Sequence, residues 1–200
     1  METQRVDRDL LERGRALPPP PPTKPAQGGS PPRVPPRFRD ATFASFDLKR
    51  NPKMKPALDA AQAMARGERK LLFLYGPPGL GKTHLACAVV QEHPLANFWE
   101  VPEFLAWLRS HYGKEMGGEL VEQIVHNYQQ AEGALLVLDD LGAHNQTAWA
   151  EEQLYRILNG RYNNDAPTLI TANVDIGRID ERIRSRFRSG MVICEGSDLR

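Results

Sequence analysis

The sequence of 200 residues predicts an α/β fold in which a parallel five-stranded sheet is sandwiched between helices. Three apolar runs, at residues 71–75, 134–138 and 168–171, have the length and composition of buried strands. Helical patterns separate these runs, and short apolar strands that alternate with helices form parallel sheets covered on both faces. Two further short strands are expected near residues 97–101 and 191–194.

The first 36 residues differ in composition from the rest. Ten of the chain's seventeen prolines lie at residues 18–36, a density that prevents the packing of a core. We therefore expect residues 1–36 to be a disordered, proline-rich tail, in which residues 1–17 have the apolar spacing of a short helix. Residues 37–200 are expected to form one folded domain.

The helices of this domain are predicted from apolar residues at helical spacing and from residues that favour helix starts. Pro56 and Pro102 suit the first turn of a helix, and Thr147 suits an N-cap. The remaining helices are expected to begin near Lys82 and to cover residues 120–128 and 179–187.

Residues 76–83 read Gly-Pro-Pro-Gly-Leu-Gly-Lys-Thr and lie between the first strand and the next helix, where a phosphate-binding loop is found. The three glycines allow the backbone to point successive N–H groups at one anion. Lys82 can reach the β- and γ-phosphates of ATP, and the Thr83 hydroxyl suits a Mg²⁺ ligand. The predicted nucleotide contacts are Gly76, Pro77, Pro78, Gly79, Leu80, Gly81, Lys82, Thr83 and His84.

Polar residues follow the second and third apolar strands. Asp139 and Asp140 come directly after residues 134–138, and Asn173 comes two residues after residue 171. Because ligands of such sheets bind at the carboxyl ends of the strands, one site can contain all three side chains. We expect Asp139 on the Mg²⁺ side of the site, Asp140 polarising the attacking water, and Asn173 hydrogen-bonded to the γ-phosphate or the water. A strand-terminating turn is the alternative for Asn173.

Composition restricts the compartment more than it restricts the partners. The chain has 26 basic and 25 acidic residues, although basic residues gather in residues 31–70 and 178–188. Cys87 and Cys194 are isolated, so neither a disulfide framework nor a Cys-based zinc site is indicated, and both are expected to be buried. No apolar run reaches membrane-spanning length, and the charged N-terminus is unlike a signal peptide. We expect a cytoplasmic protein without a membrane partner.

Several segments together resemble AAA+ ATPases of the DnaC/DnaI helicase-loader type and the related IstB transposition helpers. These are Leu-Leu-Val-Leu-Asp-Asp-Leu-Gly at residues 135–142, Thr-Leu-Ile-Thr-Ala-Asn at 168–173, Arg-Ile-Arg-Ser-Arg-Phe at 182–187, Pro-Pro-Arg-Phe-Arg-Asp-Ala-Thr-Phe at 35–43, and the loop at 76–83. The resemblance covers about residues 35–200. It implies a P-loop NTPase fold of the AAA+ class without a C-terminal lid domain. It also implies roles for the residues: Lys82 and Thr83 as Walker A, Asp139 and Asp140 as Walker B, Asn173 as sensor 1 and Arg186 as arginine finger.

The ends of the chain compare differently with this family. Residues 195–200 resemble the family's C-terminus, so we expect the chain to be complete there. Helicase loaders usually carry a folded N-terminal domain that contacts the helicase, whereas about 35 residues precede the core here.

The resemblance implies an ATP-dependent helicase loader that binds single-stranded DNA, forms homo-oligomers on ATP or DNA and delivers a replicative helicase. The alternative is an IstB-like helper that assembles on double-stranded DNA and recruits a transposase. A small-molecule P-loop kinase is a third option, but the sequence offers no candidate for a mobile lid or an acceptor site.

The helical stretch at residues 102–130 is the expected single-stranded DNA surface, by likeness to the loaders. Arg109, His111 and Lys114 could follow phosphates while Tyr112 stacks on a base, and a solvated helix face is the alternative. Two other aromatic residues of this region, Trp107 and Tyr128, have the helical spacing of core residues rather than base-stacking groups. Adenine is expected near residues 38–46, again by likeness to the family.

Arg186 is the remaining candidate. At helical spacing Arg182 and Arg186 share one face, while Ile183 and Phe187 share another that can pack on the core. We expect the arginine face to point away from the chain's own nucleotide, so that Arg186 reaches the ATP of a neighbouring subunit. A solvated arginine-rich helix or a DNA-phosphate patch is the alternative.

Overall fold

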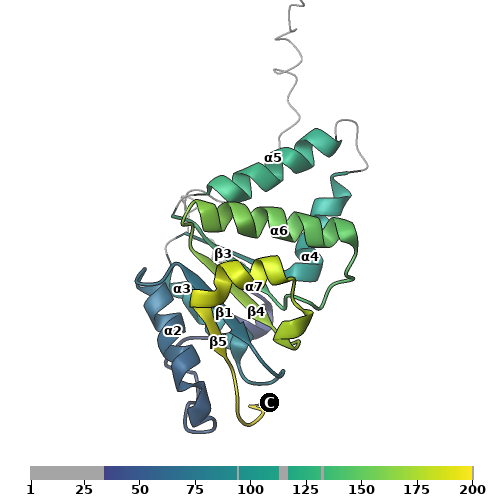
Figure 1. Ribbon diagram of the computed structural model, residues 1–200. Helices are drawn as coiled ribbons and strands as arrows, with labels where there is room; N and C mark the ends of the chain where they lie inside the picture. Colours follow the sequence, from purple (N-terminus) through teal and green to yellow (C-terminus); the bar gives the residue numbers. More distant parts are fainter. Residues whose placement is uncertain (1–33, 94, 113–116, 132, 200) are drawn as a thin grey trace, which may run out of the picture.

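The computed structural model describes residues 34–93, 95–112, 117–131 and 133–199, so the predicted tail lies almost wholly outside the described residues. Five strands form one sheet in the order β2-β3-β4-β1-β5, and every pairing is parallel (Figure 1). The predicted parallel five-stranded sheet is confirmed. Its strands are β1 (Leu71–Tyr75), β2 (Ala96–Glu100), β3 (Leu135–Asp139), β4 (Thr168–Ala172) and β5 (Met191–Ile193).

Helices cover both faces of the sheet (Figure 1). On one face, α2 (Lys55–Ala65) and α3 (Lys82–Glu92) pack on alternate residues of β1 and β3, such as Leu72 and Val137. On the other face, the intervening residues, such as Phe73 and Leu138, meet the remaining helices. These are α4 (Val101–Ser110), α5 (Gly117–Gln130), α6 (Ala148–Asn163) and α7 (Glu181–Phe187). Single-turn 3₁₀ helices are η1 (Pro36–Phe38), η2 (Pro52–Met54), η3 (Ile176–Arg178) and η4 (Arg188–Gly190).

The predicted helix starts and core residues agree with the structure to within a few residues. Thr147 is the N-cap of α6, and its hydroxyl oxygen accepts a hydrogen bond from the Ala150 N–H at 3.2 Å. Tyr128 is buried and Trp107 packs on the same core, so the prediction that both are core residues is confirmed. Cys87 and Cys194 are buried and free, also as expected.

Arg161 is the largest fully buried side chain of the core. Its guanidinium donates to the Thr168 hydroxyl and to the backbone carbonyl oxygens of Tyr128, Ala134 and Pro167, at 2.6 to 2.9 Å. Burial lowers its pKa to about 10. These four bonds connect α6 to the end of α5 and to the amino ends of β3 and β4. The predicted site lies at the opposite, carboxyl ends of these strands.

The described helices are all too short or too polar to cross a lipid bilayer.

Candidate nucleotide-binding site

The phosphate loop lies between β1 and α3, as predicted. The Lys82 side chain is buried, and its ammonium group donates to the carbonyl oxygens of Gly76 at 2.8 Å and Pro77 at 2.6 Å. Burial lowers the pKa of Lys82, although nearby carboxylates act in the opposite direction. The ammonium group is therefore held inside the loop, at the amino end of α3, where a helix favours an anion.

Gly81 is the N-cap residue of α3 and has a φ of 86°, in the left-handed region. A Cβ atom at this position would lie 2.6 Å from the ring of Phe46, so a side chain is excluded both by the backbone conformation and by the neighbouring ring. The sequence predicts the first of these constraints but not the second.

Asp139 ends β3 and faces the loop. Its two carboxylate oxygens lie 3.0 and 3.1 Å from the Thr83 hydroxyl oxygen, and one of them accepts a bond from the Thr171 hydroxyl at 2.6 Å. The pKa of Asp139 is raised to about 6, chiefly by burial and also by the charge of the neighbouring Asp140, although the two hydroxyl donors lower it. The structure thus joins the two residues predicted as Mg²⁺ ligands, Thr83 and Asp139.

Asp140 and Asn173 are also brought together. Asp140 has a φ of 61°, an unusual conformation for a residue with a side chain, and its N–H donates to the Thr171 hydroxyl at 2.9 Å. The Asn173 amide donates to the Asp140 carboxylate at 2.6 Å. Asn173 is therefore an orienting partner of Asp140, in addition to its predicted place at the end of β4.

Thr171 is a site residue that the sequence reasoning missed. It occupies β4, and its hydroxyl donates to Asp139 while accepting from the Asp140 backbone. The sequence does contain a signal, because Thr171 is a polar residue in a fully buried strand, two positions before Asn173. A buried hydroxyl needs a partner, and the nearest strand end offers two acidic residues.

Glu100 is a second missed residue. It ends β2 directly opposite Asp139 in the strand register. Burial raises its pKa, and the charges of Glu103 and Asp140 raise it further. The Asp140 charge raises the pKa of both Glu100 and Asp139, so like charges act on one another at this edge of the sheet.

The segment of residues 38–46, which we call the lead-in segment, lies against α3. The Gln91 side chain donates to the carbonyl oxygens of Ala41 at 2.8 Å and Arg39 at 3.1 Å, and His84 Nε2 lies 2.9 Å from the Thr42 carbonyl oxygen. Phe46 contacts the His84 ring edge-on at 5.5 Å between centroids. The lead-in segment is thus adjacent to the phosphate loop, while adenine binding there stays a prediction.

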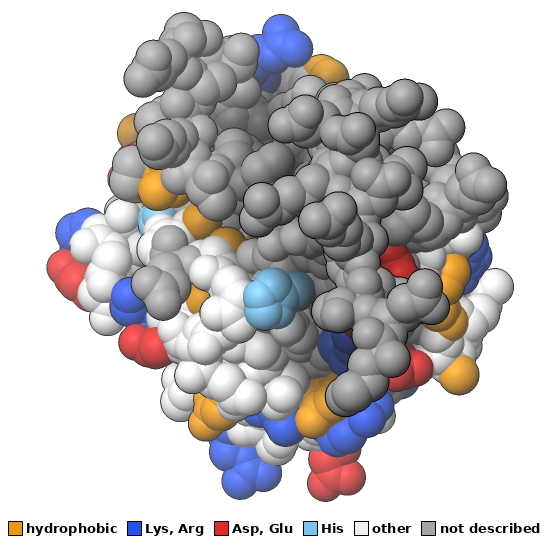
Figure 2. Space-filling view, turned by 90° about the horizontal axis from the view of Figure 1, so that it is seen from above, with side chains coloured by type: hydrophobic (Ala, Val, Ile, Leu, Met, Phe, Trp, Pro, Cys, Tyr) orange, Lys and Arg blue, Asp and Glu red, His pale blue; other side chains and the backbone are white. Residues whose placement is uncertain are grey.

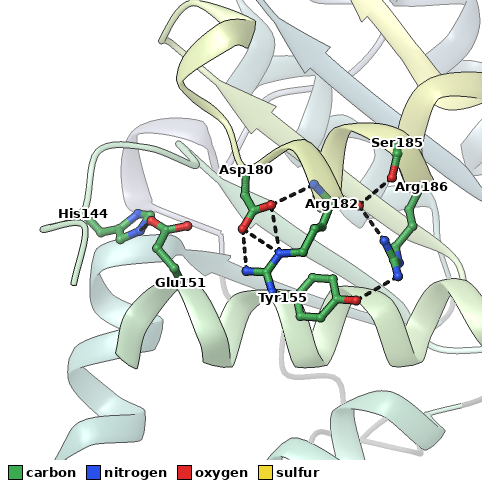
Figure 3. Close-up of polar contacts among 7 residues, drawn as sticks. All are labelled: His144, Glu151, Tyr155, Asp180, Arg182, Ser185 and Arg186. Atoms are coloured by element: carbon green, nitrogen blue, oxygen red, sulfur yellow. Dashed lines mark hydrogen bonds and ion pairs between the residues drawn. The ribbon is translucent and has the colours of Figure 1, made fainter. Parts of the chain in front are cut away.

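Arg186 does not join this network within the described residues. Its guanidinium donates to the Tyr155 hydroxyl and the Arg182 carbonyl oxygen, each at 2.8 Å (Figure 3). It also donates to the Asn159 side chain. Ile183 and Phe187 are buried in the core, as predicted. Arg182 is exposed and Arg186 is half-buried, and the guanidinium groups of both lie over the Tyr155 ring of α6.

The predicted DNA surface is partly altered by the structure. His111 is buried, with Nδ1 2.8 Å from the Trp107 carbonyl oxygen, so the prediction that it follows phosphates is wrong. Arg109 stacks on Trp149 of α6 at 4.8 Å, and the exposed Tyr112 meets the same ring edge-on. Lys114 lies outside the described residues. Described side chains of both charge signs are visible around the rim of the face over α5 (Figure 2).

Comparison with known proteins identifies the family. Residues 72–194 match the family model described as "ATPase family associated with various cellular activities (AAA)". Because this match covers more than half of the chain, the chain belongs to the AAA family of ATPases.

Two curated relatives are named for ATP binding and for helicase loading. A putative ATP-binding protein in an insertion sequence of Mycobacterium tuberculosis is 28% identical over 141 residues, which are 66% of this chain and 53% of that protein. The replicative helicase loader DnaI of Bacillus subtilis is 28% identical over 112 residues, 54% of this chain and 34% of that protein. The chain thus spans between about a third and two thirds of the curated relatives that it matches.

Solved structures share the fold. The DnaC helicase loader superimposes with a TM-score of 0.63 at 23% identity, covering 80% of this chain and 98% of that chain. DnaI gives a TM-score of 0.64 at 23% identity, covering 84% and 95%. AMPPCP-bound DnaA from Aquifex aeolicus gives 0.67 at 19% identity, covering 80% and 52%.

Proposed function

We propose that this AAA-family chain hydrolyses ATP with Mg²⁺ and uses the energy to load a replicative helicase onto single-stranded DNA. The observation that carries the ATPase part is one hydrogen-bonded edge of the sheet, where Thr83, Asp139 and Asp140 meet Thr171 and Asn173. The loader part is supported by the likeness of the fold to DnaC over nearly the whole of that chain.

The residues at this edge fit Mg²⁺. The Thr83 hydroxyl oxygen lies 3.0 and 3.1 Å from the two carboxylate oxygens of Asp139. Hydroxyl and carboxylate oxygens are ligands that this ion takes. Within the described ranges, no three His, Cys, Asp or Glu side chains are grouped to hold a metal by themselves. This agrees with the way Mg²⁺ binds, through one or two protein oxygens together with nucleotide phosphates. When bound, Mg²⁺ would neutralise charge on the phosphates.

The chain's own residues would divide the remaining work. Lys82 exchanges its two carbonyl partners for the β- and γ-phosphates, and the backbone N–H groups of residues 76–83 bind the same anion. Asp140 orients the attacking water and accepts its proton, while Asn173 holds the Asp140 carboxylate in place. Thr171 fixes the relative position of the two aspartates because it bonds to both.

Arg186 is proposed to act on the ATP of a neighbouring subunit in a homo-oligomer. Its partners within the described chain all belong to α6 and α7, and none belongs to the phosphate loop. An arginine supplied in trans stabilises charge on the transferred phosphoryl group and accelerates hydrolysis about 10³-fold or more. Mixing Arg186→Ala with Lys82→Ala, each inactive alone, should restore turnover where an intact Arg186 faces an intact loop. Absence of recovery in proven mixed oligomers would refute the trans role.

The proposed DNA surface consists of Arg109, Tyr112 and Trp149. An arginine stacked on a tryptophan beside an exposed tyrosine combines a phosphate partner with rings on which bases stack. The alternative function, a helper ATPase on double-stranded DNA, is favoured by the relative from an insertion sequence. Both functions use the same ATPase site, so the preferred form of DNA distinguishes them.

The test is ATP turnover with matched single-stranded and double-stranded oligonucleotides over a range of salt. A loader should be stimulated more by single strands, with affinity falling as salt rises. Arg109→Ala combined with Tyr112→Ala should abolish this stimulation without affecting basal turnover. Lys53→Ala combined with Tyr162→Ala is the matched control, since both residues are exposed and neither belongs to the proposed surface. Stimulation by double strands alone would favour the transposition helper. Stimulation that persists in the Arg109→Ala, Tyr112→Ala double variant would rule out this surface.

A further inference from the structure

Two pairs of side chains meet where α7 crosses α6. Tyr155 and Asn159 are four residues apart on α6, and Arg182 and Arg186 are four residues apart on α7, so each pair shares one face of its helix. The Arg182 and Arg186 guanidinium groups lie 4.1 and 4.9 Å from the centre of the Tyr155 ring. Figure 3 shows Tyr155 between the two arginines and the α6 backbone.

The two arginines are nevertheless in different electrostatic situations. Arg182 forms an ion pair with Asp180 at 2.7 Å, and the hydrogen bond from Arg182 lowers the pKa of that carboxyl. Arg186 bonds only to neutral oxygen atoms, and no carboxylate of the described chain forms an ion pair with it. Asp180 therefore offsets the charge of Arg182 by direct contact, whereas it acts on Arg186 only through space, so the positive charge of Arg186 remains available to an anion.

The bonds of Arg186 also leave part of its guanidinium unused. A guanidinium group has five N–H donors. Three of them are used, one by each of Asn159, Arg182 and Tyr155, which leaves one donor on each terminal nitrogen. Terminal N–H groups left in this way can donate to phosphate oxygens.

We propose that Tyr155 and Asn159 are positioning residues, which hold Arg186 in a fixed orientation so that it is presented to the γ-phosphate of a neighbouring subunit. This inference rests on the proposed trans role of Arg186. A side chain fixed before the reaction loses little entropy when it meets the phosphate, whereas a free arginine must be ordered at that moment. The opposite interpretation, in which the same bonds sequester Arg186, predicts that weakening them would raise turnover.

Tyr155→Phe is the sharpest perturbation, because it keeps the ring under both arginines and removes only the hydroxyl acceptor. We expect kcat for ATP to fall about tenfold, as for a lost hydrogen bond to a charged group, with KM unchanged. Tyr162→Phe is the control, since this tyrosine lies on the same helix and is 45% exposed. A second variant, Asn159→Asp, keeps an acceptor but places a carboxylate on Arg186, and should lower kcat at least as far.

Three results separate positioning from a general structural effect. Tyr155→Phe added to Arg186→Ala should cause no further loss, because Tyr155 acts through Arg186. Mixing Tyr155→Phe with Lys82→Ala should restore turnover, because the second variant supplies an intact Tyr155 and Arg186 in trans. Thermal unfolding should show both variants folded.

The outcomes also separate this inference from the proposed function. If Arg186→Ala is inactive and is rescued by mixing, but Tyr155→Phe turns over ATP at the wild-type rate or faster, positioning is refuted and the trans arginine stands. If Arg186→Ala itself retains the wild-type rate, both are refuted.

Discussion

Replacing Asp139 by Asn should make the nucleotide-free protein more stable at neutral pH while abolishing the proposed ATP turnover with Mg²⁺. In the folded chain the pKa of Asp139 is raised from 3.8 to about 6, chiefly by burial. The folded state therefore binds a proton more tightly than the unfolded state, and the stability of the wild type falls as pH rises from about 4 to 6. Above that window the loss is complete and constant.

The size of the effect follows from the two pKa values. A difference of about two pKa units, at about 1.4 kcal/mol for each unit, corresponds to about 3 kcal/mol of stability lost at pH 7. Asn cannot ionise, so the variant lacks this loss. It also lacks one acceptor for the Thr83 and Thr171 hydroxyls, but that cost does not change with pH. The difference between the two proteins should therefore grow with pH by a predictable amount.

The assay is urea unfolding of both proteins without nucleotide or Mg²⁺ from about pH 4.5 to about pH 8. About 2 of the 3 kcal/mol should appear across this range as a growing advantage of the variant. ATP turnover with Mg²⁺ should be lost in the variant at every pH. A difference in unfolding free energy that stays constant with pH would show that Asp139 is not a buried carboxyl with a raised pKa.

Three further predictions concern single residues. Lys82→Ala should abolish tight nucleotide binding, measured by titration with a fluorescent ATP analogue; retained affinity would contradict the loop assignment. Asp140→Asn should leave ATP binding intact and slow single-turnover hydrolysis, because an amide cannot accept the proton of the water; hydrolysis at the wild-type rate would exclude its role. Arg161→Ala should lower the unfolding free energy by about 3 kcal/mol or more, because it leaves buried acceptors without donors; a loss under about 1 kcal/mol would show that water replaces the guanidinium.

The main part of the site could be predicted because it depends on a property of all parallel sheets. Strands in parallel end at the same edge, so residues that follow each apolar run must lie near one another. Asp139 ends β3 and Asp140 follows it, Asn173 follows β4, and Thr83 lies in the first turn of the helix after β1. Hydrogen bonds join Thr83 to Asp139 and Asn173 to Asp140. The observed strand limits differ from the predicted ones by only one residue, for example β2 at 96–100 instead of 97–101. A difference of this size leaves the site residues at the carboxyl ends of the strands.

Two features could not be predicted from local patterns. His111 directly follows α4, at a position where an exposed polar residue is expected. Its ring nevertheless turns back toward the Trp107 carbonyl oxygen, and the side chain is buried. The helical spacing of Arg186 places it on a face that points away from the core. Its orientation is nevertheless set by Tyr155 and Asn159, which lie on α6 and are separated from α7 in the sequence by β4. In both cases the deciding contact is a hydrogen bond whose partner the apolar periodicity does not reveal.

The phosphate loop shows a third limit of the pattern, because its shape depends on a segment far away in the sequence. A Cβ atom at Gly76 would lie 2.2 Å from the Cys194 carbonyl oxygen, and one at Gly79 would lie 2.2 Å from the Asp198 carboxylate. The Leu199 N–H donates to the Gly79 carbonyl oxygen at 2.8 Å, which fixes residues 194–199 against the loop. The glycines are therefore needed for close approach as well as for their turns. The conformation of the backbone that would bind phosphate therefore depends on the sequence of residues 76–83 and also on its contacts with the segment that follows β5.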